Sequence, residues 1–244
     1  MKITVDSKIG DVVALDYRTA TIFENYKIDF CCGGYKTIGH SCRNNSEAEN
    51  LVEELTAQIN LESNSSIDFN SWQTDLLIDY IVKKHHRYVL KSVPIIKGYL
   101  TKICSVHGIK HPELFEIRDI FFDSVEELSV HMKKEEDELF PYLLSLIDNT
   151  SSFKSNFSNN EIDGNILVKD LIKDHENEGE KYRRISELTN NFTTPDDGCT
   201  TYNIALLSLK EFQSDLHLHV HLENNILFPR AVMLETIKTE GIIN

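Results

Sequence analysis

The sequence contains two copies of a histidine and glutamate pair whose members lie four positions apart. His131 and Glu135 form the first copy, and His219 and Glu223 form the second; both fit the pattern H-x-x-x-E-x-x-x-L-F-P. Residues four apart on a helix share one face, so each copy can present an imidazole and a carboxylate to one metal ion. A single pair of this kind is usual on a solvated helix surface, whereas repetition of the whole pattern favours a metal site.

A further histidine precedes each copy at nearly the same distance. His86 lies 45 residues before His131, and His175 lies 44 residues before His219. This spacing indicates one helical hairpin used twice, and two packed hairpins would bring four histidines and two glutamates into one interior. Nitrogen and oxygen donors without thiolate suit iron, manganese or zinc, and a carboxylate bridge between two ions particularly suits iron. We therefore expect two non-haem iron ions.

The neighbouring histidines should face elsewhere. His85 is one residue from His86, which turns its side chain by about 100 degrees on a helix, so only one of the two should face the metals. His217 and His221 each lie two residues from His219, and solvated or outer roles are expected for them.

The cysteines fall into two groups. Cys31 and Cys32 precede two glycines, which permit a sharp turn and should leave the sulfurs accessible, so this pair is a candidate for thiol chemistry. An inert turn is the alternative. Cys42, Cys104 and Cys199 stand alone and are expected to be packing residues.

The segments that must position these side chains have the pattern of helices. The chain has only five prolines and ten glycines, and apolar residues recur at helical spacing without sustained strand alternation, which predicts an all-α fold. Long helices are predicted at about 72–105, 112–148, 164–190 and 201–237. With short to medium connections they favour an antiparallel four-helix bundle that can hold a cofactor in its core.

A smaller helical domain is predicted ahead of the bundle. Residues 1–60 hold short helical pieces, at about 11–26 and 46–59, on either side of the Cys31-Cys32 turn. The polar run 61–71 lacks periodic apolar residues and is predicted to be a linker. The bundle domain is then expected to span residues 72–244.

The composition of the chain argues against several classes of function. A net charge of -14 disfavours binding to nucleic acid or to anionic membranes. The chain has no apolar run long enough for a membrane span, and its N-terminus does not have the pattern of a secretory signal. Five cysteines, an odd number, favour reduced thiols and a cytoplasmic location.

Two motifs together resemble the iron-sulfur cluster repair di-iron proteins, also called the Repair of Iron Centres family. In the N-terminal region the resemblance rests on residues 26–34, which read YKIDFCCGG. In the bundle region it rests on His86 with Pro94, on HMKKEE at 131–136, on DHE at 174–176, and on the segment from His219 to Arg230. The resemblance implies that His86, rather than His85, is the histidine that faces the metals.

Membership of this family would imply a hemerythrin-like bundle with a di-iron centre. The ligands implied are His86, His131, Glu135, His175, His219 and Glu223, with the irons bridged by the two glutamates and an oxo or hydroxo group. The family's activity implies repair of iron-sulfur clusters damaged by nitric oxide or oxidative stress, by iron donation to damaged iron-sulfur proteins.

Other functions of the same site stay open at this point. An oxygen or nitric-oxide carrier or sensor could use it, and so could a nitric oxide reductase, although an iron donor is expected rather than a conventional enzyme. The cysteine domain favours repair. The sequence names neither the electron donor nor the client, and it leaves open whether the chain forms a homodimer.

Overall fold

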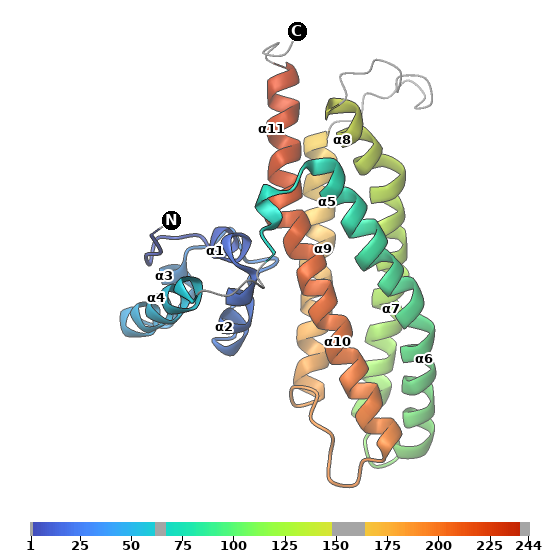
Figure 1. Cartoon of the computed structure of the whole chain (residues 1–244). Coiled ribbons are helices and arrows are strands. Elements are labelled where there is room, and N and C mark those ends of the chain that lie inside the picture. The colour runs from blue at the N-terminus through green and yellow to red at the C-terminus, as the bar shows by residue number, and fades with distance from the viewer. Residues whose placement is uncertain (1, 62–66, 148–163, 240–244) are drawn as a thin grey trace. The chain divides into compact units, whose positions relative to one another are not determined.

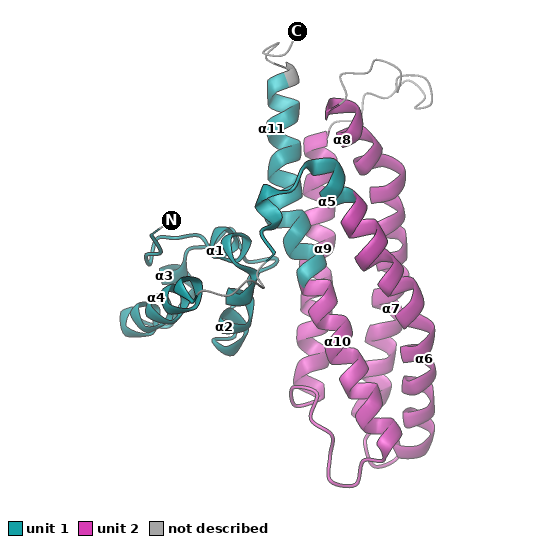
Figure 2. Cartoon of the chain, in the orientation of Figure 1, with its two compact units in different colours: residues 1–78, 218–244 teal, residues 79–217 magenta. Residues whose placement is uncertain are grey.

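The structure of the chain is a computed structural model that describes residues 2–61, 67–147 and 164–239. In this part of the chain the regular structure is helical, with a single antiparallel bridge between Lys8 and Thr37 and no strand (Figure 1). The predicted all-α fold is confirmed. The chain divides into two compact units, residues 1–78 with 218–244 and residues 79–217 (Figure 2).

The long helices fall on the four predicted segments. The first segment contains α5 (Thr74–Tyr80), a π-helical turn (Ile81–His86) and α6 (Arg87–His107). The second contains α7 (Glu113–Lys134), a π-helical turn (Glu135–Leu139) and α8 (Phe140–Ile147). The third is α9 (Gly164–Leu188), and the fourth contains α10 (Thr200–Leu222), a π-helical turn (Glu223–Leu227) and α11 (Phe228–Thr239).

Within the unit of residues 79–217, one aromatic side chain joins the packed helices. The ring of Phe212 on α10 lies 6.0 Å from Tyr88 on α6, 5.5 Å from Phe121 on α7 and 5.9 Å from Tyr182 on α9, measured between centroids. Phe121, Tyr182 and Phe212 are fully buried. Phe212 therefore contacts an aromatic ring on each of the other three helices, which fixes their spacing around the core.

The N-terminal helices of the other unit are short. They are α1 (Ile9–Leu15), α2 (Ala20–Asn25), α3 (Ile38–Ser41) and α4 (Asn45–Asn60). The piece predicted at 11–26 is divided into α1 and α2 by a turn at Asp16, whereas the piece predicted at 46–59 is the single helix α4. The side chain of Asn44 accepts a hydrogen bond from the Glu47 N–H, which fixes the start of α4.

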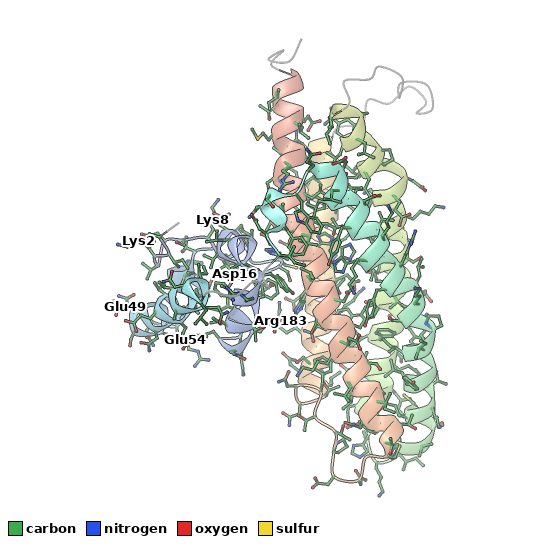
Figure 3. The ribbon with its side chains drawn as sticks, in the orientation of Figure 1. Lys2, Lys8, Asp16, Glu49, Glu54 and Arg183 are labelled. Carbon is green, nitrogen blue, oxygen red and sulfur yellow. The ribbon has the colours of Figure 1, made fainter. Side chains whose placement is uncertain are left out.

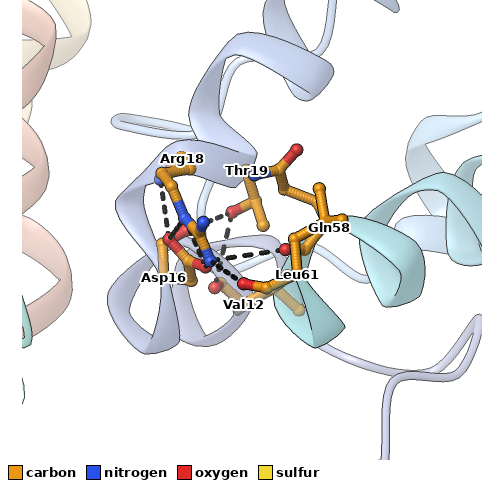
Figure 4. A network of polar contacts seen from close by, with 6 residues as sticks. All are labelled: Val12, Asp16, Arg18, Thr19, Gln58 and Leu61. Carbon is orange, nitrogen blue, oxygen red and sulfur yellow. Dashed lines mark hydrogen bonds and ion pairs between the residues drawn. The ribbon is translucent and has the colours of Figure 1, made fainter. Parts of the chain in front are cut away.

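An ion pair between buried Asp16 and partly exposed Arg18 lies at the corner between α1 and α2. Asp16 is buried, and Arg18 Nη2 lies 2.6 Å from its Oδ2 (Figure 4). The same guanidinium nitrogen donates to the carbonyl oxygens of Gln58 at 3.3 Å and Leu61 at 3.4 Å, at the end of α4. Arg18 therefore connects this corner to the end of α4 by hydrogen bonds, which helps to hold the small helices together.

This unit also contains the C-terminal part of the chain. Arg230 on α11 donates hydrogen bonds to the carbonyl oxygens of Trp72 at 2.7 Å and Asn70 at 2.9 Å. Residues Phe69–Ser71 form a 3₁₀ turn with Phe69 buried, so the end of the predicted linker is packed. Residues 62–66 of that linker lie outside the described residues, and the domain boundaries stay a prediction.

The surface of the helices is charged. Glu49 and Glu54 are exposed on α4, and Lys2 and Lys8 are exposed in the segment before α1 (Figure 3). Among the described residues, no helix combines the length and the apolarity needed to cross a membrane.

Replacement of Phe212 by alanine should strongly destabilise the unit of residues 79–217. The change removes a ring that contacts three helices and leaves a cavity, so we expect the free energy of unfolding to fall by about 3–5 kcal/mol. Denaturant unfolding followed by circular dichroism measures the loss. Leu207→Ala, on the same helix but 53% exposed, should change the stability far less. Equal losses in the two variants would contradict the role given to Phe212.

Candidate metal centre

Three of the predicted ligands lie in π-helical turns. His86 ends the turn Ile81–His86, while Glu135 and Glu223 each begin one. The N–H of Phe140 donates to the Glu135 carbonyl oxygen, five residues earlier, and the N–H of Phe228 donates in the same way to that of Glu223. A proline follows each phenylalanine and supplies no N–H, which interrupts the ordinary helical ladder at this point. Such π-turns within helices are frequent at functional sites.

Four of the six predicted ligands come together within the unit of residues 79–217. The carboxylate of Glu135 lies between two histidines, with Oε2 3.4 Å from His86 Nε2 and Oε1 3.1 Å from His131 Nε2. His175 Nε2 lies 2.9 Å from His131 Nε2. All four side chains are buried. They come from the α5–α6 segment, from α7 and its π-turn, and from α9.

The donor spacing fits a metal ion with ligand bonds of about 2.1 Å. Bonds of about 2.1 Å place two donors about 3.0 Å apart when they meet at a right angle and about 3.4 Å apart at a tetrahedral angle. The 2.9 Å between the His131 and His175 nitrogens and the 3.1 Å from His131 to Glu135 are close to the right-angle value. Two histidines with one carboxylate are also the donor set of many non-haem ferrous sites. The buried set therefore suits iron.

Outer carboxylates orient two of these imidazoles. His86 Nδ1 lies 2.6 Å from Glu136 Oε1, and His131 Nδ1 lies 3.3 Å from Asp174 Oδ2. A carboxylate at Nδ1 favours the tautomer whose Nε2 is free of a proton and can bind a metal. The sequence reasoning missed these partners, although each is the immediate neighbour of a predicted ligand, Glu136 after Glu135 and Asp174 before His175.

The other two predicted ligands belong to the unit of residues 1–78 and 218–244. His219 Nε2 lies 3.0 Å from Glu223 Oε1, and both side chains are buried. This pair has the same separation of four residues and nearly the same nitrogen to oxygen distance as His131 and Glu135. Each copy of the repeated motif therefore forms a buried imidazole and carboxylate pair.

The histidines next to these ligands make other contacts. His85 Nδ1 lies 3.0 Å from Asp215 Oδ2, and His217 Nε2 lies 3.4 Å from Gln213 Nε2. His221 is fully buried against the rings of Tyr17 and Phe30, which excludes the solvated role, one of the two roles expected for it. Burial lowers the pKa of His221 to about 3, which keeps the imidazole neutral.

A buried carboxyl group one helical turn beyond His175 was not predicted. Glu178 on α9 accepts a hydrogen bond from Ser124 Oγ at 2.5 Å and one from Lys181 Nζ at 3.0 Å. Lys181 in turn pairs at 2.6 Å with the exposed Glu127. Burial raises the pKa of Glu178, while its hydrogen bonds oppose that shift. No sequence motif marked this residue, because its burial depends on the packing of α7 against α9.

The two candidate thiols differ in exposure. Cys31 is buried, whereas Cys32 is partly exposed, so the expected accessibility holds for only one sulfur. Their sulfur atoms lie 3.8 Å apart, and neither is in a disulfide. The Cys31 carbonyl oxygen accepts hydrogen bonds from the side-chain amides of Asn224 and Asn225, which hold this backbone in place.

Cys199 does not pack as predicted. It is exposed, directly before the first residue of α10, and its sulfur lies 3.2 Å from His107 Nε2. The hydrogen bond with His107, together with the backbone N–H groups of Thr201 and Tyr202, lowers the pKa of Cys199 to about 7. Cys104, by contrast, is buried as expected.

The reactivity of Cys199 should follow this pKa. Alkylation by iodoacetamide should accelerate as the pH rises through about 7, because only the thiolate reacts. His107→Gln should move this midpoint upward, toward the value of an ordinary cysteine. Peptide mass spectrometry measures the rate for each cysteine, and buried Cys104 serves as the unreactive internal control. An unchanged midpoint in the variant would show that His107 does not activate the thiol.

Family models match both parts of the chain. The hemerythrin HHE cation binding domain matches residues 77–231. The ScdA_N model, described as a domain of unknown function (DUF542), matches residues 5–59. Together they cover the two regions from which the metal-site and cysteine motifs were identified.

Relatives that match nearly the whole chain carry related names. The iron-sulfur cluster repair protein ScdA of Staphylococcus epidermidis is 32% identical over 94% of this chain and 99% of its own length. The iron-sulfur cluster repair protein YtfE of Yersinia pestis is 31% identical over 93% and 97% of the two chains. YtfE of Musicola paradisiaca is 28% identical over 93% and 96%. This chain therefore belongs to the family of iron-sulfur cluster repair proteins that carry a hemerythrin HHE cation-binding domain.

Proposed function

We propose that this protein repairs damaged iron-sulfur clusters by donating iron from a two-iron centre. The proposed ligands are His86, His131, Glu135, His175, His219 and Glu223. The observation that carries the proposal is the position of Glu135, whose two carboxylate oxygens face different histidines, His86 and His131. A carboxylate placed in this way can bridge two ions, and the repeated motif supplies Glu223 as its counterpart.

The donor set suits an iron centre that can lose its metal. Four neutral imidazoles and two carboxylates bring less negative charge than a carboxylate-rich site, and reduction of iron weakens each bond further. Iron supplies the redox-dependent affinity, while Glu136 and Asp174 hold the imidazoles of His86 and His131 in their binding orientation. The iron is here both the bound metal and the cargo.

The cysteine region supports repair over gas carriage. A carrier or sensor of oxygen or nitric oxide needs only the metal centre, whereas this chain also carries Cys31 and Cys32, within a region that the ScdA_N model matches. Damaged iron-sulfur proteins are the proposed partners, with an electron donor that reduces the centre before iron leaves. The cytoplasm is the proposed compartment, because the odd number of cysteines favours reduced thiols.

The first test concerns the metal. Purified full-length protein should bind about two iron atoms per chain in a nitrogen and oxygen environment, and the double variant His131→Ala/His219→Ala should lose both. Metal analysis and X-ray absorption measure the content and the ligands. The matched control His217→Ala removes a histidine two residues from His219 and should leave the iron content unchanged. Full iron content in the double variant would refute the ligand assignment.

The second test concerns repair. Reduced iron-loaded protein, mixed with a nitrosylated or oxidised iron-sulfur enzyme, should restore that enzyme's activity, whereas the metal-free protein should not. Isotopically labelled iron should move from the protein into the client. The variant Cys31→Ser/Cys32→Ser should keep its iron spectrum and repair more slowly, because thiolates can accept iron or nitrosyl groups in transit.

The outcomes of the repair assay separate the competing functions. Restored activity without label transfer would exclude iron donation. Reversible oxygen binding without any restoration would favour a carrier or sensor, and consumption of nitric oxide with electrons from a donor would favour a reductase.

A further inference from the structure

A second group of potential metal ligands lies in the N-terminal region and shares no residue with the histidine-rich set. Asp29, Cys31 and Cys32 each offer one ligand atom, and these atoms all lie within 4.8 Å of one another. All three residues belong to the turn that follows α2, so their proximity arises from one short segment of backbone. We infer that this turn is a binding site for a single thiophilic divalent cation, such as Fe²⁺, Zn²⁺ or Co²⁺.

The distances between the atoms match a tetrahedral ion. Bonds of about 2.3 Å to sulfur place two thiolates about 3.8 Å apart at the tetrahedral angle, and a carboxylate oxygen bound at about 2.0 Å lies about 3.5 Å from each sulfur. The two sulfur atoms here are 3.8 Å apart, and Cys31 Sγ lies 3.3 Å from Asp29 Oδ1. Two of the three separations are therefore close to the tetrahedral values, and the third pair, Cys32 and Asp29, lies within 4.8 Å.

The backbone of this turn is held from several sides. The carbonyl oxygens of Phe30 and Cys31 accept hydrogen bonds from the Asn225 side chain at 3.2 and 3.4 Å. A Cβ atom on Gly33 would lie 2.6 Å from the Asp29 carbonyl oxygen, and one on Gly34 would lie 2.4 Å from Asn225 Oδ1. Only glycine fits this close approach, so the two glycines allow the turn to pack as it does.

The chemistry of the three groups also favours a cation. The hydrogen bond with Cys32, burial, and the neighbouring charges of Cys32 and Asp29 raise the pKa of Cys31 well above its usual value. A divalent ion would favour deprotonation, since it takes the place of the proton on each coordinating thiol and offsets two of the three negative charges that two thiolates and one carboxylate carry. Asp29 is exposed and Cys32 is partly exposed, so an ion can enter and leave from solvent.

Asp29 also has a purely structural role, which the test must separate from ligation. Its Oδ1 accepts the backbone N–H of Cys31 at 3.0 Å and that of Cys32 at 2.9 Å. Asp29→Asn keeps a side-chain oxygen for these two bonds and removes the negative charge. The variant therefore preserves the turn while it weakens the metal site.

Cobalt binding to the full-length protein tests the inference. Anaerobic, reduced protein titrated with Co²⁺ should show sulfur-to-cobalt charge-transfer absorption that saturates at one ion per chain. The histidine-rich set has no thiolate and cannot give this absorption. Cys31→Ser and Cys32→Ser should each weaken or abolish it, whereas Cys42→Ser and Cys199→Ser should leave it unchanged. Asp29→Asn should bind cobalt roughly tenfold or more weakly, since even indirect partners of a ligand change affinity by that much.

Several results would overturn the site. They are the absence of charge-transfer absorption, its survival in the double variant Cys31→Ser/Cys32→Ser, and wild-type affinity in Asp29→Asn. Far-ultraviolet circular dichroism and iron content of the bundle show whether each variant is folded. Loss of reduced thiols in air without any cobalt signal would identify the pair as a disulfide-forming pair instead.

A role for this site as the first acceptor of iron that leaves the bundle rests on the proposed function. The cobalt titration does not depend on that role. If the cobalt titration succeeds and the repair assay fails, the metal site of Cys31 and Cys32 is supported and iron donation is refuted. If the titration fails and the repair assay succeeds, iron donation is supported and this metal site is refuted.

Discussion

A carboxylate without access to solvent constrains the arrangement of the bundle. Glu135 has no exposed surface, and removal of an ionised carboxylate from water costs several kcal/mol unless partners replace the lost hydration. Here the partners are the imidazoles of His86 and His131. They come from two other points of the chain, the end of the π-turn before α6 and the last full turn of α7. The helices must therefore pack in a register that brings these groups to the same level, and the aromatic layer around Phe212 holds that register from within the apolar core.

The π-helical turns at Glu135 and Glu223 depart from the regular helical repeat at the two proposed carboxylate ligands. An ordinary helix advances each side chain by a fixed angle, so a histidine and a glutamate four residues apart share a face but cannot be adjusted independently. The wider turn that begins at Glu135, and again at Glu223, shifts the backbone hydrogen bond from the residue four positions back to the residue five positions back. The proline that follows each turn removes one backbone donor, and the altered hydrogen bonding begins just before it. The Leu-Phe-Pro sequence after each glutamate thus has a structural reason to accompany the ligands.

Much of this arrangement follows from periodicity and repetition in the sequence. Helical spacing predicted the long helices to within a few residues, and the repeated motif predicted which residues form the two buried pairs, His131 with Glu135 and His219 with Glu223. Features that depend on tertiary packing could not be predicted from the sequence. The burial of Glu178 requires α7 and α9 in contact, the burial of His221 requires the rings of Tyr17 and Phe30, and the activation of Cys199 requires His107 from a distant helix. None of these partners is near in sequence, so no local pattern can reveal them.

Within the unit of residues 1–78 and 218–244, the proposed iron ligand Glu223 directly precedes two residues that contact the turn of Cys31 and Cys32. Glu223 is followed directly by Asn224 and Asn225, whose side chains donate to the carbonyl oxygens at Phe30 and Cys31. Asn225 also lies 3.0 Å from His221 Nδ1, one turn back on the same helical segment. The π-turn that begins at Glu223 therefore carries both the carboxylate and the amides that hold the Cys31 backbone. Glu223 and the two amides that contact the cysteine turn are thus three consecutive residues of one helical turn.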